Sequence, residues 1–365
     1  MTDPRGKGLS DDTGGIMLLA YQKPGLTIGP AQENDPLLVK PLQRDLRALG
    51  YLRGNVDGAY GPGTEKAVRA LQFDLLHNDG QSSGGDGLAP VALIDINRDQ
   101  GDKAVTIVTG MLDQALAGCI AALIADERIP KLPSSAQASA ENAKALQTIA
   151  GSVSTVVPSP FIAAIVRQES GGQHYRVPDG RNEDNFIVVG LDHGQAADAD
   201  RVTSRGYGIG QYTLFHHPPR PEEVADFMLD PVRNVSKAET ELRGKFDRFV
   251  VSDKHGSDDR KAEHPLLPLR ICRYAPSDSR YLRDCRNCAS AASKTDIGPG
   301  TPVYAGAAIT YQVDQYYPSA IYRSVPHRAD FLCDWPYAVR RYNGGGLDSY
   351  HYQTRVLLNL LNLPG

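Results

Sequence analysis

The sequence predicts a mainly α-helical protein, an α+β chain in which helices dominate and one small hairpin is present. Apolar residues recur at helical spacing in separate stretches, at 161–170, 221–250, 302–322, 335–342 and 349–362. One short run, 186–189, has the composition of a strand and lies between polar turn residues. The chain has 365 residues, of which 41% are hydrophobic and 22% charged, so its length allows two or three ordinary globular domains.

The net charge and the distribution of apolar residues argue against a nucleic-acid partner and against insertion into a membrane. The formal net charge of -4 provides no basic field that would meet phosphates, so we expect no nucleic-acid partner. The most apolar window, 104–125, contains Asp113 and Gln114 and has a one-sided stripe, so we expect a buried helix and no membrane insertion. The N-terminus lacks an apolar segment after a basic start, which predicts a protein made in the cytoplasm without a signal peptide.

Composition divides the chain into four segments. Residues 1–35 are rich in Gly, Pro and Asp and are predicted to form a flexible N-terminal arm. Residues 36–98 form a compact module, and residues 99–150 form a helical connector that is broken by a Pro/Ser/Ala-rich stretch. Residues 151–365 are predicted to form the second, larger domain.

The compact module consists of helices joined by a turn. Gly50 ends the first helix, 56–58 reads as a turn, and Thr64 is predicted to cap the second helix with Glu65 in its first turn. The inner faces of the two helices are predicted to carry Leu42, Leu46, Leu49, Val68, Leu71 and Leu75.

This module resembles a known family. The segment LQRDLRALGYLRGNVDGAYGPGTEKAVRALQ is similar to the peptidoglycan-binding domain type 1 repeat, over about 40 residues. The resemblance implies a three-helix wall-binding module for muropeptide or glycan, with a site at Asp57, Gly58, Tyr60, Gly61 and Thr64. A helical linker that binds nothing is the alternative, since a fold does not establish a function.

One carboxylate lies in the middle of an apolar helical stripe. In the run FIAAIVRQESGG, residues 161–172, Glu169 falls on the same face as Ile165, and Arg167 points to the far side. An apolar face disfavours the charged form of a glutamate, and the negative end of the helix dipole acts in the same direction. A carboxylic acid that keeps its proton is the donor that glycosidic-bond cleavage requires. The alternative is a glutamate exposed at a frayed helix end.

Three segments match one enzyme family in order: QESGG, SRGYGIGQYTL and RYNGGG. Together they resemble a lytic transglycosylase of the goose-lysozyme-like superfamily, which includes the soluble lytic transglycosylases. The resemblance implies a lysozyme-like helical catalytic domain, with Glu169 as the catalytic residue. It assigns substrate contacts to Ser170, Tyr207, Gly208, Ile209, Gln211, Tyr342 and Asn343.

The resemblance also implies a mechanism on the bond between N-acetylmuramic acid and N-acetylglucosamine. Glu169 protonates the leaving oxygen, the 2-acetamido oxygen attacks C1, and ionised Glu169 then removes the C6 hydroxyl proton to close a 1,6-anhydro ring. One residue acts as acid and then as base. No cofactor and no metal are required.

The chain departs from the family pattern between Glu169 and Gln211. A longer acidic insert contains Asp179, Glu183, Asp184 and Asp192. An aspartate of this insert could hold a water across the sugar, which would make the protein an inverting hydrolase (a muramidase) with carboxyl groups roughly 6.5–9.5 Å apart. The competing interpretation is a solvated loop, because acidic residues are mostly exposed.

Two further alternatives concern activity and delivery. The second domain could be inactive, so that the protein only anchors itself to the wall. A wall-cleaving protein made in the cytoplasm needs a holin, a secretion apparatus or lysis in order to act in the periplasm or on the cell wall. The order of binder first and cutter second resembles phage endolysins, and injected antibacterial effectors share it.

The chain has five cysteines, and most of them lie near its end. Cys285 and Cys288 form a C-x2-C pair that could complete a structural zinc site with Cys272 and Cys333. The same four cysteines could form two disulfides outside the cytoplasm, or remain unlinked. In each case we expect them to have no part in the chemistry.

Overall fold

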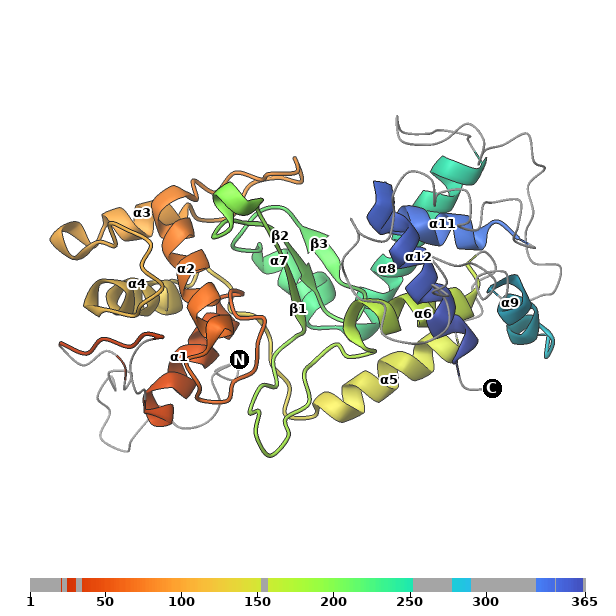
Figure 1. Cartoon of the computed structure of the whole chain (residues 1–365), viewed down its shortest axis with the longest axis horizontal. Coiled ribbons are helices and arrows are strands. Elements are labelled where there is room, and N and C mark those ends of the chain that lie inside the picture. The colour runs from red at the N-terminus through yellow and green to blue at the C-terminus, as the bar shows by residue number, and fades with distance from the viewer. Residues whose placement is uncertain are drawn as a thin grey trace, which may run out of the picture. The chain divides into compact units, whose positions relative to one another are not determined.

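The computed structural model describes residues 21, 25–30, 35–151, 157–251, 278–289, 333–344 and 346–363. The chain divides into two compact units (Figure 1). The N-terminal unit comprises residues 1–142 and 173–234, and the C-terminal unit comprises residues 143–172 and 235–365. The boundary falls within two helices, α5 (Ala138–Gly151) and α8 (Pro231–Phe246).

Four helices and a sheet make up most of the N-terminal unit. The helices are α1 (Pro36–Ala48), α2 (Pro62–His77), α3 (Leu93–Arg98) and α4 (Gln114–Ala125). Short helical turns lie at η2 (Gly101–Lys103), η3 (Ala196–Asp198), α7 (Pro221–Glu223) and η4 (Val224–Met228). Asp35 and Asp113 cap α1 and α4, because each carboxylate accepts a hydrogen bond from a backbone N–H of the first turn.

The sheet has three antiparallel strands in the order β1 (Val189–His193), β2 (Val202–Tyr207) and β3 (Tyr212–Leu214). Tyr207 pairs with Val189 on one side and with Tyr212 on the other. The tight turn 208–211 therefore joins β2 to β3. One hydrophobic core runs through α1, α2, α4 and this sheet, and it includes Leu46, Leu71 and Leu116.

This division differs from the predicted domains, which place 173–234 with the C-terminal segment. The segment 173–234 packs against α1 and α2 through buried ion pairs. Arg47 of α1 meets Asp184 at 2.6 Å with both side chains fully buried, and Arg205 of β2 meets Asp74 of α2 at 3.0 Å. The predicted connector 99–150 likewise contributes α4 to the N-terminal core.

The C-terminal unit is helical throughout its described part. It contains α6 (Ser159–Ser170), η5 (Asp247–Val251), α9 (Tyr281–Ala289), α11 (Trp335–Tyr342) and α12 (Gly346–Leu361), together with most of α5 and α8. α12 packs against α6, α9 and α11. Trp335, the single tryptophan of the chain, stacks on Phe246 with ring centroids 4.2 Å apart.

The predicted fold class, mainly α with a small hairpin, is confirmed. The helices expected at 161–170, 335–342 and 349–362 correspond to α6, α11 and α12, and the one expected at 302–322 lies outside the described residues. The strand predicted at 186–189 begins only at Val189. Phe186 and Ile187 instead form isolated bridges to Ser134 and Tyr175.

The predicted cap at Thr64 is wrong. Gly61 is the N-cap of α2, and Pro62 takes the first helical position. Proline fits that position because its fixed φ suits a helix and its missing N–H would have no partner there. Thr64 is the third residue of the helix, where it is buried.

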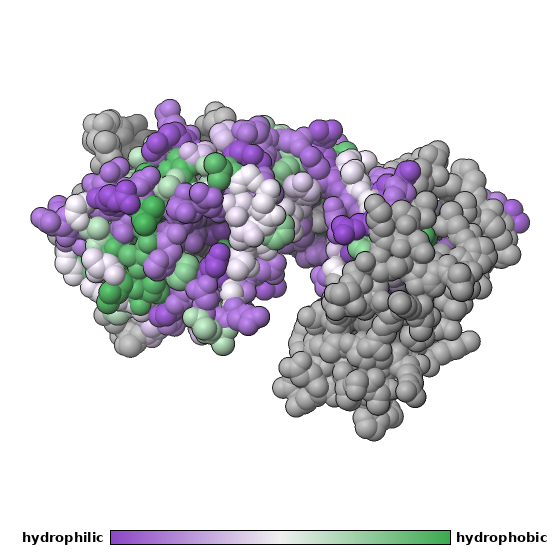
Figure 2. Space-filling model, turned by 90° about the horizontal axis from the view of Figure 1, so that it is seen from above, coloured by the Kyte–Doolittle hydropathy of each residue, from purple (hydrophilic) through white to green (hydrophobic). Residues whose placement is uncertain are grey.

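Within the described residues, no helix is both long enough and apolar enough to cross a membrane. α4 covers 12 residues of the apolar window 104–125, and its inner stripe, Leu116, Ile120 and Leu123, is buried. Figure 2 shows hydrophobic residues gathering at the end of the N-terminal unit where Figure 1 places α3 and α4.

Candidate functional site

Glu169 lies in the last turn of α6, in the C-terminal unit. The helix ends where Gly171 adopts a left-handed conformation with φ 66°, and the N–H of Gly171 donates to the carbonyl of Arg167. Ile165 and Val166 are fully buried, whereas Glu169 is half-buried. The carboxylate is therefore held beside the apolar core without being sealed inside it.

Two tyrosines lie next to this carboxylate. The Tyr352 hydroxyl of α12 donates a hydrogen bond of 2.5 Å to Oε1 of Glu169. The ring of Tyr342, at the end of α11, stacks on Tyr352 with centroids 6.0 Å apart and planes 15° from parallel. Three helices thus bring Glu169, Tyr342 and Tyr352 together.

Burial and the negative charge of Glu169 both raise the pKa of the Tyr352 hydroxyl well above its ordinary value. The pKa of Tyr342 is raised by burial, and further by the charges of Glu169 and Glu241. Both hydroxyls therefore keep their protons at neutral pH. They remain available as hydrogen-bond donors beside the carboxylate.

The two other predicted site residues of this unit are placed differently. Ser170 donates its hydroxyl to the carbonyl of Val166, 3.0 Å away, within its own helix. Asn343 is the exposed residue that ends α11. Their predicted role in substrate binding stays a prediction.

The remaining predicted site residues, Tyr207, Gly208, Ile209 and Gln211, belong to the N-terminal unit. Tyr207 ends β2, and the other three lie in the turn 208–211 that joins β2 to β3. Gln211 has a positive φ of 49°, and its side-chain amide donates to the carbonyl of Gly208 at 2.7 Å. The Oε1 atom of Gln211 lies against Gly190 of β1, where an added Cβ would come within 2.4 Å of this oxygen. The amide of Gln211 is thus used within the turn.

Two buried side chains, His174 and Asn234, form hydrogen bonds with the backbone of the same turn. Nδ1 of His174 accepts the N–H of Ile209 at 3.2 Å, and its Nε2 then donates to the carbonyl of Met228 at 2.9 Å. Burial lowers the pKa of His174 to about 4, so its ring is neutral. Asn234 accepts the N–H of Gly210 at 2.7 Å and donates to the carbonyl of Tyr207.

The acidic insert is largely used for folding. Asp184, expected in a solvated loop, is fully buried because Arg47 binds its Oδ2 with two guanidinium nitrogens. Glu183 pairs with Lys40, and Asp179 accepts two backbone N–H groups of its own turn, which lower its pKa. Asp192 is exposed and accepts the Ser204 hydroxyl.

The predicted wall-binding residues surround a turn that is held by one glutamine. Gln43 of α1 accepts the N–H groups of Asp57 and Gly58 through its Oε1. Its Nε2 donates to Asp57 Oδ1 and Thr64 Oγ1, each at 3.0 Å. The Tyr60 hydroxyl donates to the carbonyl of Gly110 at 2.7 Å. Gly61, the N-cap of α2, completes this turn.

A second glutamine repeats this arrangement one helix later. Gln72 of α2 accepts the N–H groups of Thr109 and Gly110, each at 2.9 Å, and donates to Thr109 Oγ1 and the carbonyl of Met111. In both cases a buried amide satisfies several groups of a turn that contains a positive-φ glycine, Gly58 or Gly110. Two successive helices thus each hold one turn.

Residues 37–75 match the family model described as a putative peptidoglycan binding domain. The N-terminal unit carries a peptidoglycan-binding module. The matched residues cover α1, the turn held by Gln43 and most of α2. This match supports cell-wall binding, with peptidoglycan as a partner. No curated protein and no solved structure matches the chain.

Sequence reasoning missed Tyr352. The notable signal is its position one helical turn before Val356, which places it on the inner stripe of α12 with Val356 and Leu360. An inward tyrosine whose partner lies on another helix cannot be paired from spacing alone.

The cysteine prediction is only partly covered by the described residues. Cys285 and Cys333 are buried, whereas Cys272 and the side chain of Cys288 lie outside the described part. Zinc, disulfides or unlinked thiols therefore stay a prediction. No group of three or more His, Cys, Asp or Glu side chains among the described residues could hold a metal ion.

Proposed function

We propose that the C-terminal unit cleaves the β-1,4 bond between N-acetylmuramic acid and N-acetylglucosamine in the bacterial cell wall, with Glu169 as proton donor. The observation that carries the proposal is the half-buried Glu169 carboxylate at a helix end, with a tyrosine hydroxyl bonded to it. A carboxyl group in this setting can reach a substrate and is also held in one orientation. The peptidoglycan-binding module of the same chain supports the choice of substrate.

Tyr352 has a distinct role in this proposal. Once Glu169 has given up its proton, the hydroxyl of Tyr352 donates to the new carboxylate and stabilises it. Since the pKa of Tyr352 is raised, the hydroxyl does not compete with Glu169 as an acid. Tyr352 is therefore a positioning residue that acts through Glu169.

The proposed reaction is non-hydrolytic and needs no second carboxylate. Glu169 transfers its proton to the glycosidic oxygen, the C1–O bond breaks, and the 2-acetamido oxygen bonds to C1. The Glu169 carboxylate then takes the C6 hydroxyl proton, and O6 displaces the acetamido oxygen to form the 1,6-anhydro ring. Glu169 ends the cycle protonated, so it serves first as acid and then as base.

The proposal makes no use of the insert carboxylates. Asp184 is neutralised by Arg47, and both Glu183 and Asp179 are engaged as described above. No observation favours one of them as the holder of a hydrolytic water. A muramidase and an inactive wall-anchoring protein therefore enter only as outcomes of the tests.

The test compares Glu169→Gln with Asp247→Asn, both measured on purified sacculi. Asp247 is an exposed carboxylate of the same unit, paired with Arg243 at 2.8 Å, so its variant removes one charge without touching Glu169. Loss of a general acid lowers rates by about 10²–10⁴-fold. We expect that loss in the release of soluble fragments for Glu169→Gln, and wild-type release for Asp247→Asn.

Co-sedimentation with sacculi is the accompanying measurement. Glu169→Gln should sediment with the wall as the wild type does, because binding belongs to the N-terminal unit. Equal fragment release by both variants, or no release by the wild type, would contradict the proposed cleavage and leave wall binding as the function.

A further inference from the structure

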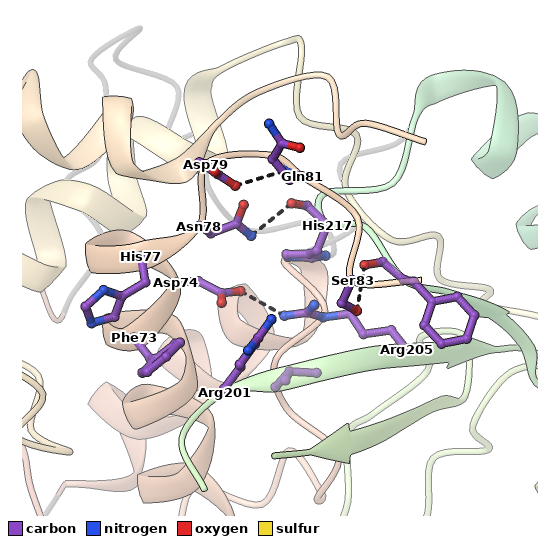
Figure 3. Close-up of a pocket in the computed structure, with 12 residues that line it drawn as sticks. Phe73, Asp74, His77, Asn78, Asp79, Gln81, Ser83, Arg201, Arg205 and His217 are labelled. Atoms are coloured by element: carbon purple, nitrogen blue, oxygen red, sulfur yellow. Dashed lines mark hydrogen bonds and ion pairs between the residues drawn. The ribbon is translucent and has the colours of Figure 1, made fainter. Parts of the chain in front are cut away.

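The loop 82–87 follows α2 and consists of serines, glycines and one aspartate. Since it has no apolar side chain to bury, polar contacts must hold it in place. The position of the loop affects a pocket of about 140 Å³ in the N-terminal unit, because Ser83 lines this pocket together with Phe215 and His217 (Figure 3).

One buried histidine connects this loop to the segment that precedes α8. The Nδ1 atom of His216 lies 3.1 Å from Oδ1 of Asp86 in the loop, and its Nε2 atom lies 2.8 Å from Oε2 of Glu223 in α7. The side chain of His216 has no exposed surface, whereas those of Asp86 and Glu223 are 27% and 11% exposed. The ring therefore bridges two carboxyl groups from different parts of the chain.

Both carboxyl oxygens that face His216 also accept other hydrogen bonds. Oδ1 of Asp86 accepts the Ser82 hydroxyl, and Oε2 of Glu223 accepts the backbone N–H of Arg220 at 2.8 Å. Burial raises the pKa of each carboxyl, but the hydrogen bonds that each accepts outweigh burial, so both pKa values are lowered. Asp86 and Glu223 are therefore ionised at neutral pH, and their oxygens can only accept.

This arrangement requires a charged ring at His216. A neutral imidazole can donate from one nitrogen only, so its second nitrogen would direct a lone pair at a carboxylate, whereas an imidazolium donates from both nitrogens. The charges also balance in the second case. The positive charges of His216 and Arg220 then match the negative charges of Asp86 and Glu223.

The other titratable groups near His216 are neutral. His217 is buried, and burial together with the charges of Arg205 and His216 lowers its pKa well below the ordinary value. Burial raises the pKa of the Tyr207 hydroxyl in β2, so this group keeps its proton. Arg205 of β2 is paired with Asp74 at 3.0 Å. Loss of the proton from His216 is therefore not compensated by another group that titrates near neutral pH.

We propose that His216 is a pH-dependent clasp, which holds the loop 82–87 while its ring is protonated and releases the loop when the ring loses that proton. Glu223 keeps its place after the change, because Arg220 binds it through both the guanidinium and the backbone N–H. Asp86 is the more exposed of the two partners, so its carboxylate turns to water.

Release of Asp86 also loosens one wall of the pocket. Its Oδ2 atom accepts the backbone N–H of Phe215 at 2.7 Å, and the N–H of Ser83 donates to the carbonyl of Phe215 at 3.0 Å. The ring of Phe215 packs against Gly84, where an added Cβ would come within 2.4 Å of it. These contacts depend on a closed loop. The inference concerns regulation of the N-terminal unit, and it does not rest on cleavage by Glu169.

The test follows hydrogen exchange of the segment 82–87 in the full-length chain by mass spectrometry. Exchange is measured at about pH 6 and about pH 9, which bracket the range in which histidines ordinarily change charge. Each rate is divided by the intrinsic rate of an unstructured peptide at the same pH, so that the ratio reports opening of the loop. We expect protection to fall about tenfold at the higher pH, the effect of losing one hydrogen bond between charged groups.

The loop around Gly110 is the internal control. The side-chain amide of Gln72 holds that loop and does not titrate, so its protection should be equal at both pH values.

Asp86→Asn separates the clasp from general effects of pH. An asparagine amide can donate to a neutral ring nitrogen or accept from a protonated one, so the loop of this variant should be equally protected at both pH values. Asp95→Asn is the matched control, since it removes an exposed carboxylate of the same unit that is paired with Arg98. This variant should keep the tenfold change.

His216→Gln removes the titrating ring and should likewise abolish the pH dependence, with circular dichroism as the check on folding. The proposal is overturned if the wild-type loop 82–87 is equally protected at both pH values. It is also overturned if Asp86→Asn responds to pH as strongly as Asp95→Asn, or if the loop around Gly110 loses as much protection as the loop 82–87.

Discussion

Two regions of the molecule carry the motifs that resemble one enzyme family, and the structure uses their polar groups in opposite ways. In the turn 208–211 of the N-terminal unit, the Gln211 amide bonds to Gly208, and His174 and Asn234 hold the backbone of the turn. At the end of α6 in the C-terminal unit, Glu169 is half-buried and meets the hydroxyl of Tyr352. The polar atoms of the first region are bonded within the fold, and the second region leaves the Glu169 carboxylate half-exposed.

This difference has a physical basis. A buried polar group without a partner is costly, so a compact turn must satisfy its amides and carbonyls with nearby side chains. A carboxyl group that is only half-buried keeps access to a ligand. Substitutions that break contacts of the N-terminal unit should therefore lower its stability, whereas substitutions around Glu169 should alter fragment release.

Asp184→Asn should destabilise the N-terminal unit most. The change leaves the guanidinium of Arg47 buried without its counter-charge, and breaking such a pair typically costs about 3–5 kcal/mol. Chemical denaturation followed by circular dichroism measures the loss. Asp95→Asn, which breaks the exposed Arg98–Asp95 pair, should cost less than about 1 kcal/mol. Equal effects of the two variants would show that Asp184 belongs to a solvated loop after all.

Gly208→Ala should destabilise the same unit by about 3 kcal/mol, since strain and overpacking add. The φ of Gly208 is 74°, and an added Cβ would come within 2.6 Å of the His174 ring and 2.8 Å of Asn234. Hydrogen exchange of the segment 205–214 should speed up. The emission of Trp335, which lies in the C-terminal unit, is the internal control and should not change. Unaltered exchange in this segment would disprove the tight packing of the turn.

His174 predicts a pH dependence of stability. Its pKa is lowered by burial from 6.5 to about 4, so the unfolded chain binds a proton between these values and the folded chain does not. The contribution of His174 to the free energy of unfolding is therefore fully present above pH 6.5. It is lost as the pH drops toward 4, which lowers the free energy of unfolding by up to about 3 kcal/mol. The wild type and His174→Gln are compared across this range. Parallel curves would contradict a neutral buried His174.

Tyr352→Phe should have the smallest effect. Removal of one hydroxyl that donates to Glu169 should lower the rate of fragment release about tenfold, or about 1.4 kcal/mol, at unchanged wall binding. The emission of Trp335 in the same unit should stay as in the wild type, which separates positioning from unfolding. A wild-type rate would remove Tyr352 from the proposal.

Local sequence patterns predicted several helices correctly but not the partners of their side chains. The apolar spacing and the following glycines predict α6 and its end at Gly171, because both depend on neighbours in the chain. Arg47 and Asp184 are 137 positions apart, and nothing in their local sequence pairs them. The position of 173–234 beside the wall-binding module follows from such contacts, which is why the predicted boundaries and the structural division differ.

The same reasoning applies to the candidate site. The stripe that contains Ile165 and Val166 placed Glu169 beside the core, a local property that spacing can reveal. The hydrogen bond from Tyr352 links residues 183 positions apart. The use of Gln211 within its turn depends on close approach to Gly190 across the sheet. The hydrogen bond from Tyr352 and the contacts of Gln211 each join residues that are distant in the sequence, so only the folded structure reveals them.

The proton-donor role of Glu169 is tested most sharply by the mass spectrum of the fragments that the chain releases from purified sacculi. We expect muropeptides with 1,6-anhydro ends from the wild type and no released fragments from Glu169→Gln. Fragments with reducing ends would show that the protein acts as a muramidase and not as a transglycosylase. Equal fragments from both proteins would contradict Glu169 as the acid.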